Sequence, residues 1–432
     1  MSPAALGASE AAAAQRVDVR AMSAGGRGVA RLADGRACFV PLAAPGDVLD
    51  IAITRERGRW TEGRILRVVD AGEARRTAPC PHYARCGGCA LQHLEYGAQL
   101  GAKADIVADA LRRIGGWDVE VGEAVGSPLE WRYRNRVTFT LRRLAGGRVV
   151  AGFFGRETRG RVVDIDDRCL LPEESLTAAW GALRAAWGVG ARRLPGGREL
   201  RLTLRSAPRG GVVLVVEGGA GAGESEALAE RVPGLVAIWH RPRGADRPRP
   251  LFSAAAAAAD EDAGFEGANA FTQVNPSAAA LLAADVAARV RATPGARVVE
   301  ADAGDGAHAR AAARAGAETV AIERDPAAVE RGRRLGPAVD FRAGDVEMRL
   351  PGALPADVLV LNPPRAGMSG DATRILLDGG AARLVYVSCD PATLARDVAR
   401  LSGAFRPVAV RAFDLFPQTA HVETVVELCA TT

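Results

Sequence analysis

Apolar and polar positions alternate in short runs over residues 16–70, as in RVDVRAM, ACFVPL, VLDIAIT and GRILRVV, and glycine-containing turns separate these runs. A period of two is typical of half-buried strands, and closely spaced strands of this kind indicate a small closed β-barrel. The segment holds ten Arg against seven Asp and Glu, a basic excess of only three. Charge alone therefore leaves RNA binding by this barrel open.

The pattern changes twice further along the chain. Residues 71–263 are predicted to form a β-rich central domain with one helical stretch at about 96–114, which we expect to pack on the last domain. Over residues 264–432, helices alternate with apolar strands, which is typical of a parallel, doubly wound α/β sheet. The alanine-rich residues 1–15 lack the features of a signal peptide and are predicted to be a disordered tail. No apolar run reaches about 18 residues, so we expect no membrane span.

Charge adds little to this picture. A net charge of +5 in 432 residues favours a polyanionic partner only weakly. Lys103 is the only lysine, so nearly all of the positive charge is carried by arginine. The chain is also rich in Ala and Gly, as expected from a GC-rich genome, and the arginine bias is therefore weak support for RNA binding.

Three of the seven cysteines lie within ten residues, at the spacing C-x5-C-x2-C. An odd number of cysteines, with no sign of export, argues against a disulfide framework. Three clustered thiolates and a distant fourth would suit either a cubane iron–sulfur cluster or a zinc ion, and the spacing does not decide between them. The four candidate ligands are Cys80, Cys86, Cys89 and Cys169.

A glycine turn follows the first apolar strand of the last domain, at Gly304 and Gly306. Glycines let a ligand approach the backbone closely at the carboxyl end of a strand. Glu323 ends the next strand, 19 residues after Gly304. A carboxylate there can accept hydrogen bonds from both ribose hydroxyls of a nucleoside-containing cofactor, although a dinucleotide fits as well. Asp345 follows a third strand-like stretch and is placed to reach an adenine amino group, but an ordinary turn residue would look the same.

Two further strands run into sequences that suggest chemistry. One ends at Asn362-Pro363-Pro364-Arg365 and the other at Cys389-Asp390-Pro391. Because ligands bind outside the carboxyl ends of such strands, Cys389 is a candidate nucleophile, with a buried structural cysteine as the alternative. Near the end, His421 and Glu423 are predicted to begin a strand and to share one of its faces.

These segments resemble a known family. FTQVN, the GDG loop, NPPRAG, VYVSCDPATLARD and FPQTAHVETVVEL are similar, in this order, to the motifs of the RNA uracil-5-methyltransferases. The first barrel resembles a TRAM domain, and the four cysteines resemble the family's 4Fe-4S ligands. Together they look most like the RlmD (RumA) branch, which methylates large-subunit rRNA. The resemblance covers nearly the whole chain from about Arg16.

The resemblance implies a class I S-adenosylmethionine-dependent methyltransferase fold with an N-terminal OB-like TRAM β-barrel and a central iron–sulfur domain. It implies a cytoplasmic enzyme that methylates carbon 5 of a uridine, with 23S rRNA as its partner, and we expect a monomer. Cys389 would be the nucleophile and Glu423 the base. The donor, S-adenosyl-L-methionine, would be held by Gln273, Gly304, Glu323, Asp345 and Asn362. The 4Fe-4S cluster would be held by Cys80, Cys86, Cys89 and Cys169.

Five positions depart from the family pattern. Asn362 stands where the family has Asp, so a carboxylate at the junction of donor and substrate has become a neutral amide. The other four are Glu300 for Asp, Ala303 for Cys, His308 for an aromatic residue and Asp390 for Asn. Two alternatives therefore stay open: an RNA-binding paralogue with impaired turnover, and the same chemistry on tRNA.

Overall fold

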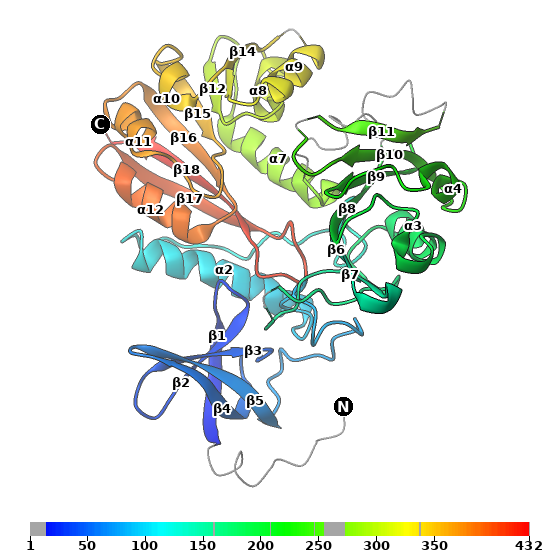
Figure 1. The fold of residues 1–432 in the computed structure, drawn as a ribbon. Helices are drawn as coiled ribbons and strands as arrows, with labels where there is room; N and C mark the ends of the chain where they lie inside the picture. The colour runs from blue at the N-terminus through cyan, green and yellow to red at the C-terminus, as the bar shows by residue number, and fades with distance from the viewer. Residues whose placement is uncertain are drawn as a thin grey trace. The chain divides into compact units, whose positions relative to one another are not determined.

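The structure is a computed structural model that describes residues 14–158, 160–207, 209–245, 247–254, 273–336 and 338–431. The predicted tail lies almost entirely outside the described residues, as does the predicted boundary between residues 263 and 264. The chain forms two compact units (Figure 1). The first comprises residues 1–77, 93–128 and 277–432, and the second residues 78–92 and 129–276. The domain limits expected from the sequence stay predictions.

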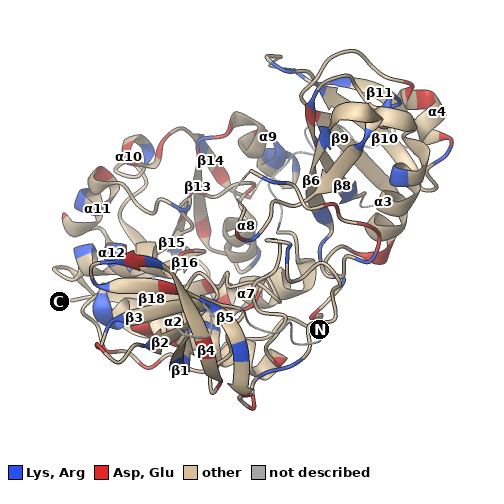
Figure 2. Ribbon diagram, turned by 60° about the horizontal axis from the view of Figure 1, so that its bottom comes forward, with Lys and Arg blue, Asp and Glu red and all other residues tan. Residues whose placement is uncertain are grey.

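A closed five-stranded barrel opens the first unit, in the order β1-β2-β3-β5-β4. Its strands are β1 (Gln15–Met22), β2 (Arg27–Arg31), β3 (Ala37–Pro41), β4 (Val48–Arg57) and β5 (Trp60–Asp70). Alternate side chains such as Val17, Val40 and Leu49 fill the barrel, as the period of two requires. On its surface Asp50 pairs with two arginines. Figure 2 accordingly shows basic and acidic residues on the same barrel strands.

The first unit also contains the doubly wound sheet, whose seven strands run in the order β14-β13-β12-β15-β16-β18-β17. Neighbouring strands from β14 to β16 are parallel, whereas β18 is antiparallel to both β16 and β17. The strands are β12 (Arg297–Ala301), β13 (Glu318–Glu323), β14 (Asp340–Ala343), β15 (Ala356–Leu361), β16 (Ala381–Ser388), β17 (Phe405–Phe413) and β18 (Glu423–Ala430).

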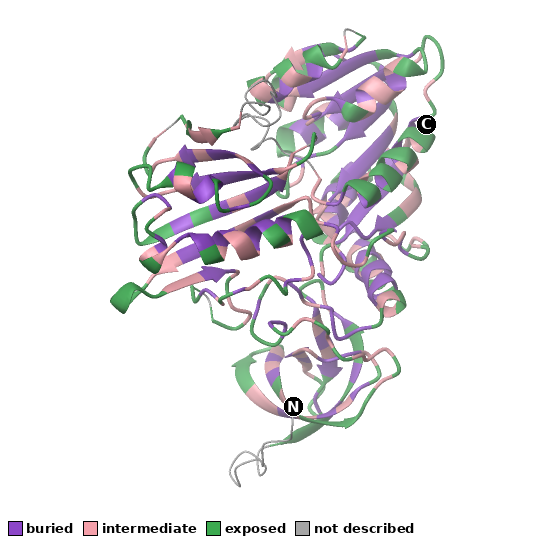
Figure 3. Ribbon diagram, turned by 90° about the vertical axis from the view of Figure 1, so that its right-hand side faces the viewer, coloured by how far each residue is buried: buried purple, intermediate pink, exposed green. Residues whose placement is uncertain are grey.

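Helices cover both faces of this sheet because its strands are apolar on both sides. Val299 and Leu384 pack with α11 and α12 on one face, whereas Val298 and Val385 pack with α7 on the other. The inner strands β12, β15 and β16 are therefore mostly buried, whereas the edge strands β14 and β17 are partly exposed (Figure 3). The helices are α7 (Pro276–Val290), α8 (Ala307–Arg314), α9 (Pro326–Arg334), α10 (Val346–Arg349), α11 (Gly370–Leu377) and α12 (Pro391–Leu401).

Helix α2 (Tyr96–Arg113) belongs to the same unit, although it lies far from the sheet in sequence. Its buried residues Leu100, Val107 and Leu111 join the core that contains α12. Polar residues of this helix, Gln99 and Lys103, are buried as well. Among the described residues, no helix is both long and apolar enough to cross a membrane.

The second unit is built on a six-stranded sheet in the order β11-β10-β9-β8-β6-β7. Phe139 of this sheet stacks on Trp180 of α3, with ring centroids 4.2 Å apart. The strands are β6 (Arg136–Arg143), β7 (Val149–Gly152), β8 (Glu199–Ser206), β9 (Val212–Glu217), β10 (Leu235–Arg241) and β11 (Arg249–Ser253). The helices are α3 (Glu174–Ala186) and α4 (Ser225–Ala229), with short 3-10 turns η1 (Ala145–Gly147) and η2 (Val189–Ala191).

Candidate active site and cysteine cavity

Four positions predicted to bind a methyl donor lie at the carboxyl edge of the parallel strands. Gly304, Glu323, Asp345 and Asn362 end or follow β12, β13, β14 and β15, respectively. These strands are neighbours in the sheet. The four positions therefore lie along one edge, which is where open α/β sheets bind their ligands.

The glycine turn and Glu323 are joined by hydrogen bonds. The N–H of Gly304 donates to Oε2 of Glu323 at 2.8 Å, and the N–H of Asp325 donates to Oε1 at 2.7 Å. Gly304 has φ +57°, and a Cβ there would meet no atom within 4 Å, so the backbone faces open space. At Gly306 a Cβ would lie 2.6 Å from Phe341, so packing excludes a side chain there. Only the first glycine leaves room for a ligand.

Asp302 is a site residue that the sequence reasoning did not identify. Burial and the negative charges of Glu323, Glu347 and Asp345 together raise the pKa of its carboxyl to about 6, and Arg324 opposes that rise. The methyl donor carries a sulfonium and an ammonium group, and a cluster of carboxylates suits such cations. Asp302 directly follows β12, and this position at the end of a strand was the one feature of the sequence that could have identified it.

Glu300 and His308, two departures from the family pattern, lie next to the glycine loop, and Glu300 has a hydrogen-bonding role there. Oε2 of Glu300 accepts the N–H of Ala309 in α8 at 2.7 Å. Burial raises the pKa of Glu300 to about 8 and lowers the pKa of His308 to about 4. Glu300 thus supports the first turn of the helix that follows the glycine loop.

Cys389 lies in the turn between β16 and α12. Asp390 caps that helix by accepting the N–H of Thr393 at 2.8 Å, a role that the family's Asn could fill equally well. The thiol is half-buried, and burial raises its pKa. The negative charge of Glu423 raises that pKa further, whereas the charge and a hydrogen bond of Arg365 lower it. The cysteine therefore has both a carboxylate and a guanidinium beside it.

Glu423 begins β18 and is 6% exposed. In the antiparallel pairing of β16 with β18, Ser388 lies opposite Thr424, so the following step places Cys389 opposite Glu423. Burial raises the pKa of Glu423 to about 7, and Arg365 opposes that rise. A carboxylate with a pKa near neutrality is suited to accept a proton.

Arg365, to which the sequence reasoning gave no role, is held by a loop with a buried anchor. Asp397 of α12 is fully buried, and its Oδ2 accepts the N–H of Met368 at 2.9 Å and the hydroxyl of Tyr386 at 2.8 Å. A Cβ at Gly367 would collide with the same carboxylate. The loop after β15 is thereby fixed close to the turn that carries Cys389.

The loop between β17 and β18, residues 414–422, is held by α2. Nζ of Lys103 donates to Oδ1 of Asp414 at 2.5 Å and to the carbonyl of Phe416 at 3.2 Å, and both charged side chains are fully buried. Gln99 donates to Oε1 of Gln418 at 3.0 Å and accepts the N–H of Gln418 at 3.0 Å. These contacts fix the segment that leads into Glu423.

One prediction about this segment is wrong. His421 was expected to begin the last strand on the same face as Glu423, but β18 begins only at Glu423. The imidazole is exposed and packs edge-on against Phe416, with ring centroids 5.8 Å apart. The two-residue period does not apply because the preceding residues form a loop.

Gln273 differs from the other predicted donor ligands in the unit to which it belongs. It is half-buried and precedes α7, and it belongs to the second unit. Its placement beside the donor therefore stays a prediction.

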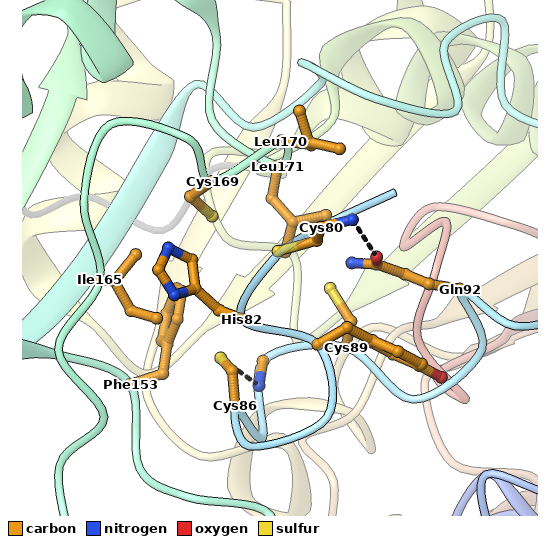
Figure 4. A pocket seen from close by; sticks show the side chains of 12 residues that line it. Cys80, His82, Cys86, Cys89, Gln92, Phe153, Ile165, Cys169, Leu170 and Leu171 are labelled. Carbon is orange, nitrogen blue, oxygen red and sulfur yellow. Dashed lines mark hydrogen bonds between the residues drawn. The ribbon is translucent and has the colours of Figure 1, made fainter. Parts of the chain in front are cut away.

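The four predicted cluster ligands line one cavity of the second unit. The cavity is bounded by Cys80, Cys86, Cys89 and Cys169 together with eight other residues, among them His82 and Phe153. Figure 4 shows the four sulfur atoms directed toward the same space. Residues far apart in sequence thus line one cavity, and their role as cluster ligands stays a prediction.

Burial in this cavity disfavours free thiolates, whereas a nearby N–H and Arg134 favour them. Burial raises the pKa of Cys89 to about 12 and of Cys169 to about 11, so these thiols need a cation in order to ionise. The N–H of Gly88 donates to Sγ of Cys86 at 3.3 Å, and Arg134 lowers the pKa of both Cys89 and Cys169. Nδ1 of His82 is buried without a hydrogen-bond partner.

No three His, Cys, Asp or Glu side chains in the described part of the chain are grouped closely enough to hold one metal ion. A tetrahedral zinc ion with bonds of about 2.3 Å would require sulfur atoms about 3.8 Å apart. In a cubane, each cysteine binds a different iron atom, so the sulfur atoms stand further apart. The cavity thus offers four thiols without the spacing of a preformed single-ion site.

The strand order, the antiparallel final strands and the glycine turn with its carboxylates define a class I S-adenosylmethionine-dependent methyltransferase. Comparison with known proteins agrees. The family described as tRNA (Uracil-5-)-methyltransferase matches residues 349–431, and the TRAM domain matches residues 11–66. The TRAM match coincides with the barrel.

Relatives and a solved structure extend this result over the whole chain. An uncharacterized RNA methyltransferase of Gloeobacter violaceus is 35% identical over 95% of each chain. One of Synechocystis is 32% identical over 94% of this chain and 93% of its own. The fold also matches the tRNA (uracil-54, C5)-methyltransferase of Pyrococcus abyssi, solved with S-adenosyl-L-homocysteine. That match has a TM-score of 0.67 and 23% identity, over 96% of this chain and 100% of that one. The chain belongs to the RNA (uracil-5-)-methyltransferase family.

Replacement of Lys103 tests the support of the 414–422 loop. Lys103→Met leaves the carboxylate of Asp414 buried without its cation, which should lower the free energy of unfolding by about 3–5 kcal/mol. Denaturant unfolding of the full chain measures the loss. Arg113 lies on the same helix but forms an exposed pair with Asp109, so Arg113→Met should cost no more than about 0.5 kcal/mol. Equal losses in the two variants would show that the buried pair has no special role.

Proposed function

We propose that this protein transfers the methyl group of S-adenosylmethionine to carbon 5 of a uridine in 23S rRNA, through a covalent adduct of Cys389 with carbon 6. The observation that carries the proposal is the grouping of Cys389, Glu423 and Arg365 at the carboxyl edge of the sheet. The same edge presents the glycine turn and carboxylates that suit the donor. The proposed nucleophile, base and donor site would thus share one edge of the sheet.

The chemistry follows from the weak nucleophilicity of carbon 5 of uracil. Attack of the Cys389 thiolate on carbon 6 turns the ring into an enolate, whose carbon 5 can displace the methyl group from the sulfonium. Arg365 stabilises the thiolate by its charge and its hydrogen bond. The target base must leave its stack to reach the cysteine.

Glu423 completes the reaction. After methyl transfer, its carboxylate removes the proton from carbon 5, the carbon–sulfur bond breaks, and the double bond between carbons 5 and 6 re-forms. Burial keeps the pKa of this carboxyl near 7, so it is a stronger base than an exposed glutamate. The products are 5-methyluridine, S-adenosylhomocysteine and the regenerated Cys389 thiolate, and the proton from carbon 5 leaves through Glu423.

The rRNA target rests on the combination of a TRAM barrel with four cysteines on one cavity. This combination resembles the branch that acts on large-subunit rRNA, and such a target places the protein in the cytoplasm, where we expect it to act as a monomer. The alternative is tRNA, which the matching family description and the Pyrococcus abyssi enzyme name. Mapping the methylated nucleotide distinguishes the two.

Asn362 favours the other alternative, an RNA-binding paralogue with impaired turnover. Its backbone N–H donates to the carbonyl of Ala301 at 3.2 Å, and its side chain is exposed. An amide oxygen can accept a hydrogen bond, as the family's carboxylate would, but it carries no negative charge. The adjacent cysteine, glutamate and arginine are the reason to favour an active enzyme.

The cysteine cavity is proposed to hold a 4Fe-4S cluster. Its support is the set of four thiols, the N–H directed at Cys86 and the charge of Arg134. Cys80, Cys86, Cys89 and Cys169 would each bind one iron atom. Bound there, the cluster would crosslink segment 78–92 to the loop that carries Cys169.

The function is tested with anaerobically purified protein, labelled S-adenosylmethionine and total RNA, followed by mapping of the modified base. The Glu423→Gln variant should accumulate a covalent protein–RNA adduct, because the amide cannot remove the carbon 5 proton. Denaturing gel electrophoresis detects the adduct. Turnover should fall by about 10²–10⁴.

Cys389→Ser is the matched control, since it should form no adduct while still binding RNA. Asn362→Asp in the same assay measures how much activity the amide costs. If the wild-type protein binds RNA but methylates none, the impaired paralogue is the better description. If methylation proceeds without any adduct in Glu423→Gln, the covalent route is wrong.

The pH profile tests the role of Arg365. Activity requires Glu423 and Cys389 in their deprotonated forms. The rate should therefore rise with pH through about 7 as Glu423 ionises, and should keep rising in more alkaline solution because the pKa of the Cys389 thiol is raised above its usual range. Arg365 lowers the pKa of both groups. Arg365→Gln should therefore shift the rising limb to higher pH and reduce the rate at neutral pH by roughly tenfold, as expected for loss of a charged hydrogen bond. A uniform loss at every pH, with no shift, would contradict this role.

Iron and sulfide analysis tests the cluster. Anaerobically purified protein should contain about four iron atoms and four sulfides per chain, with the broad visible absorbance of a cubane. Cys169→Ser should lower both contents, whereas Cys429→Ser, which does not line the cavity, should leave them unchanged. A content of one zinc ion per chain, without sulfide, would show that the four cysteines bind zinc and not a cluster.

A further inference from the structure

A second cavity of the second unit is dominated by arginine. It has a volume of about 680 Å³ and lies among Ala84–Arg85, the β6–β7 hairpin and residues 156–158 and 161–164. Five of its thirteen lining residues are arginines: Arg85, Arg142, Arg148, Arg156 and Arg161. We refer to it as the arginine hollow. Its two carboxylates are Glu157 and Asp164, and Asp164 is already paired with Arg184 outside the lining.

Two of the five arginines are engaged by the protein. Arg142 donates to Glu199 at 2.6 Å, and Arg156 donates to the carbonyls of Tyr83 at 3.1 Å and Cys89 at 2.7 Å. The other three, Arg85, Arg148 and Arg161, are exposed. Within the described residues, their side chains make no hydrogen bond or ion pair. Three unpaired guanidinium groups around one hollow repel each other, and an anion would relieve that repulsion.

Several arginines of the barrel, by contrast, are already paired with carboxylates. Arg16 and Arg67 share Asp50, and Arg27 and Arg55 share Glu62. The arginine hollow instead brings together three arginines that have no such partner among the described residues.

The hollow also has an exposed aromatic side chain at its edge. Phe154 is 46% exposed, and the guanidinium of Arg142 lies 5.7 Å from its ring centroid. Leu144, in the lining, is 41% exposed. Arginines next to an exposed aromatic ring are the combination that binds single-stranded nucleic acid, because phosphates pair with the arginines and a base stacks on the ring.

We propose that the arginine hollow binds the phosphodiester backbone of single-stranded RNA through Arg85, Arg148 and Arg161, with one base stacked on Phe154. The proposal rests on the RNA methyltransferase function proposed above and assigns part of substrate binding to the second unit. An acidic protein could satisfy the charges, but the exposed ring beside arginine favours a nucleotide.

The cysteine segment builds one wall of the hollow. The N–H of Arg156 donates to the carbonyl of Arg85 at 3.0 Å, and the N–H of Gly87 donates to the carbonyl of Phe154 at 2.9 Å. Because Arg85 and Gly87 flank Cys86, the conformation around the cysteines sets the positions of Arg85 and Phe154. Order in the cysteine cavity and the shape of the hollow are thereby linked.

The test replaces Arg85, Arg148 and Arg161 together by Ser in the full chain. The binding of a labelled single-stranded RNA oligonucleotide is measured at several salt concentrations without the methyl donor. Affinity should fall by roughly tenfold or more, and the slope of log K against log salt should decrease by about 2, at about 0.7 for each lost phosphate contact. Phe154→Leu should weaken binding by roughly tenfold without changing the slope.

The matched control removes three exposed arginines of the same unit that do not line the hollow, Arg192, Arg231 and Arg243, also by Ser. It changes the net charge equally and should keep the wild-type slope. If both triple variants lose the same affinity for RNA, the effect is one of net charge and the proposal is overturned. The proposal is also overturned if the variant of Arg85, Arg148 and Arg161 binds RNA as tightly as the wild-type protein. Because binding is measured without the donor, failed methylation by the wild-type protein would count against the enzyme function alone.

Discussion

The antiparallel pairing of β18 with β16 is the constraint on which the rest of the site depends. A wholly parallel sheet presents only the carboxyl ends of its strands at the ligand edge, and a loop follows each of them. A reversed strand instead presents its first residue there. Glu423, the first residue of β18, thereby lies opposite Cys389, which follows the last residue of β16. The sheet itself positions Glu423, and Cys389 lies in the turn directly after a strand that is paired with β18.

Buried polar anchors then fix the loops around this pair. Asp397 holds the loop that carries Arg365, and Asp414 and Gln418 tie the approach to β18 onto α2. Buried polar groups are costly without their partners, so such anchors favour the arrangement that supplies them. Oδ2 of Asp414 and Nε2 of Gln418 nevertheless have no hydrogen-bond partner among the described residues. The helix that supplies Lys103 and Gln99 comes from a distant part of the sequence. The active edge is therefore assembled from segments more than three hundred residues apart.

The barrel and the doubly wound sheet could be predicted from the sequence because periods of two and alternating helices and strands are local signals. Likewise, the order of the motifs was enough to nominate Cys389 and Glu423. Arg365 and Asp302 were missed because their relevance depends on which loops are neighbours across the sheet. His421 was misplaced because a period of two was extended across a loop. The position of Gln273 depends on how the two units are arranged, and the sequence carries no local signal for that.

The burial of Lys103 has a consequence for the chemistry of the protein surface. It is the only lysine in the chain. Its amino group is enclosed between α2 and the 414–422 loop, so no lysine amine lies at the surface. Apart from the α-amino group, an acylating reagent has a single amine to modify, and can reach it only when the helix and the loop separate. The rate of acylation at this position thus reports the opening of the segment that carries the proposed base, without any added label.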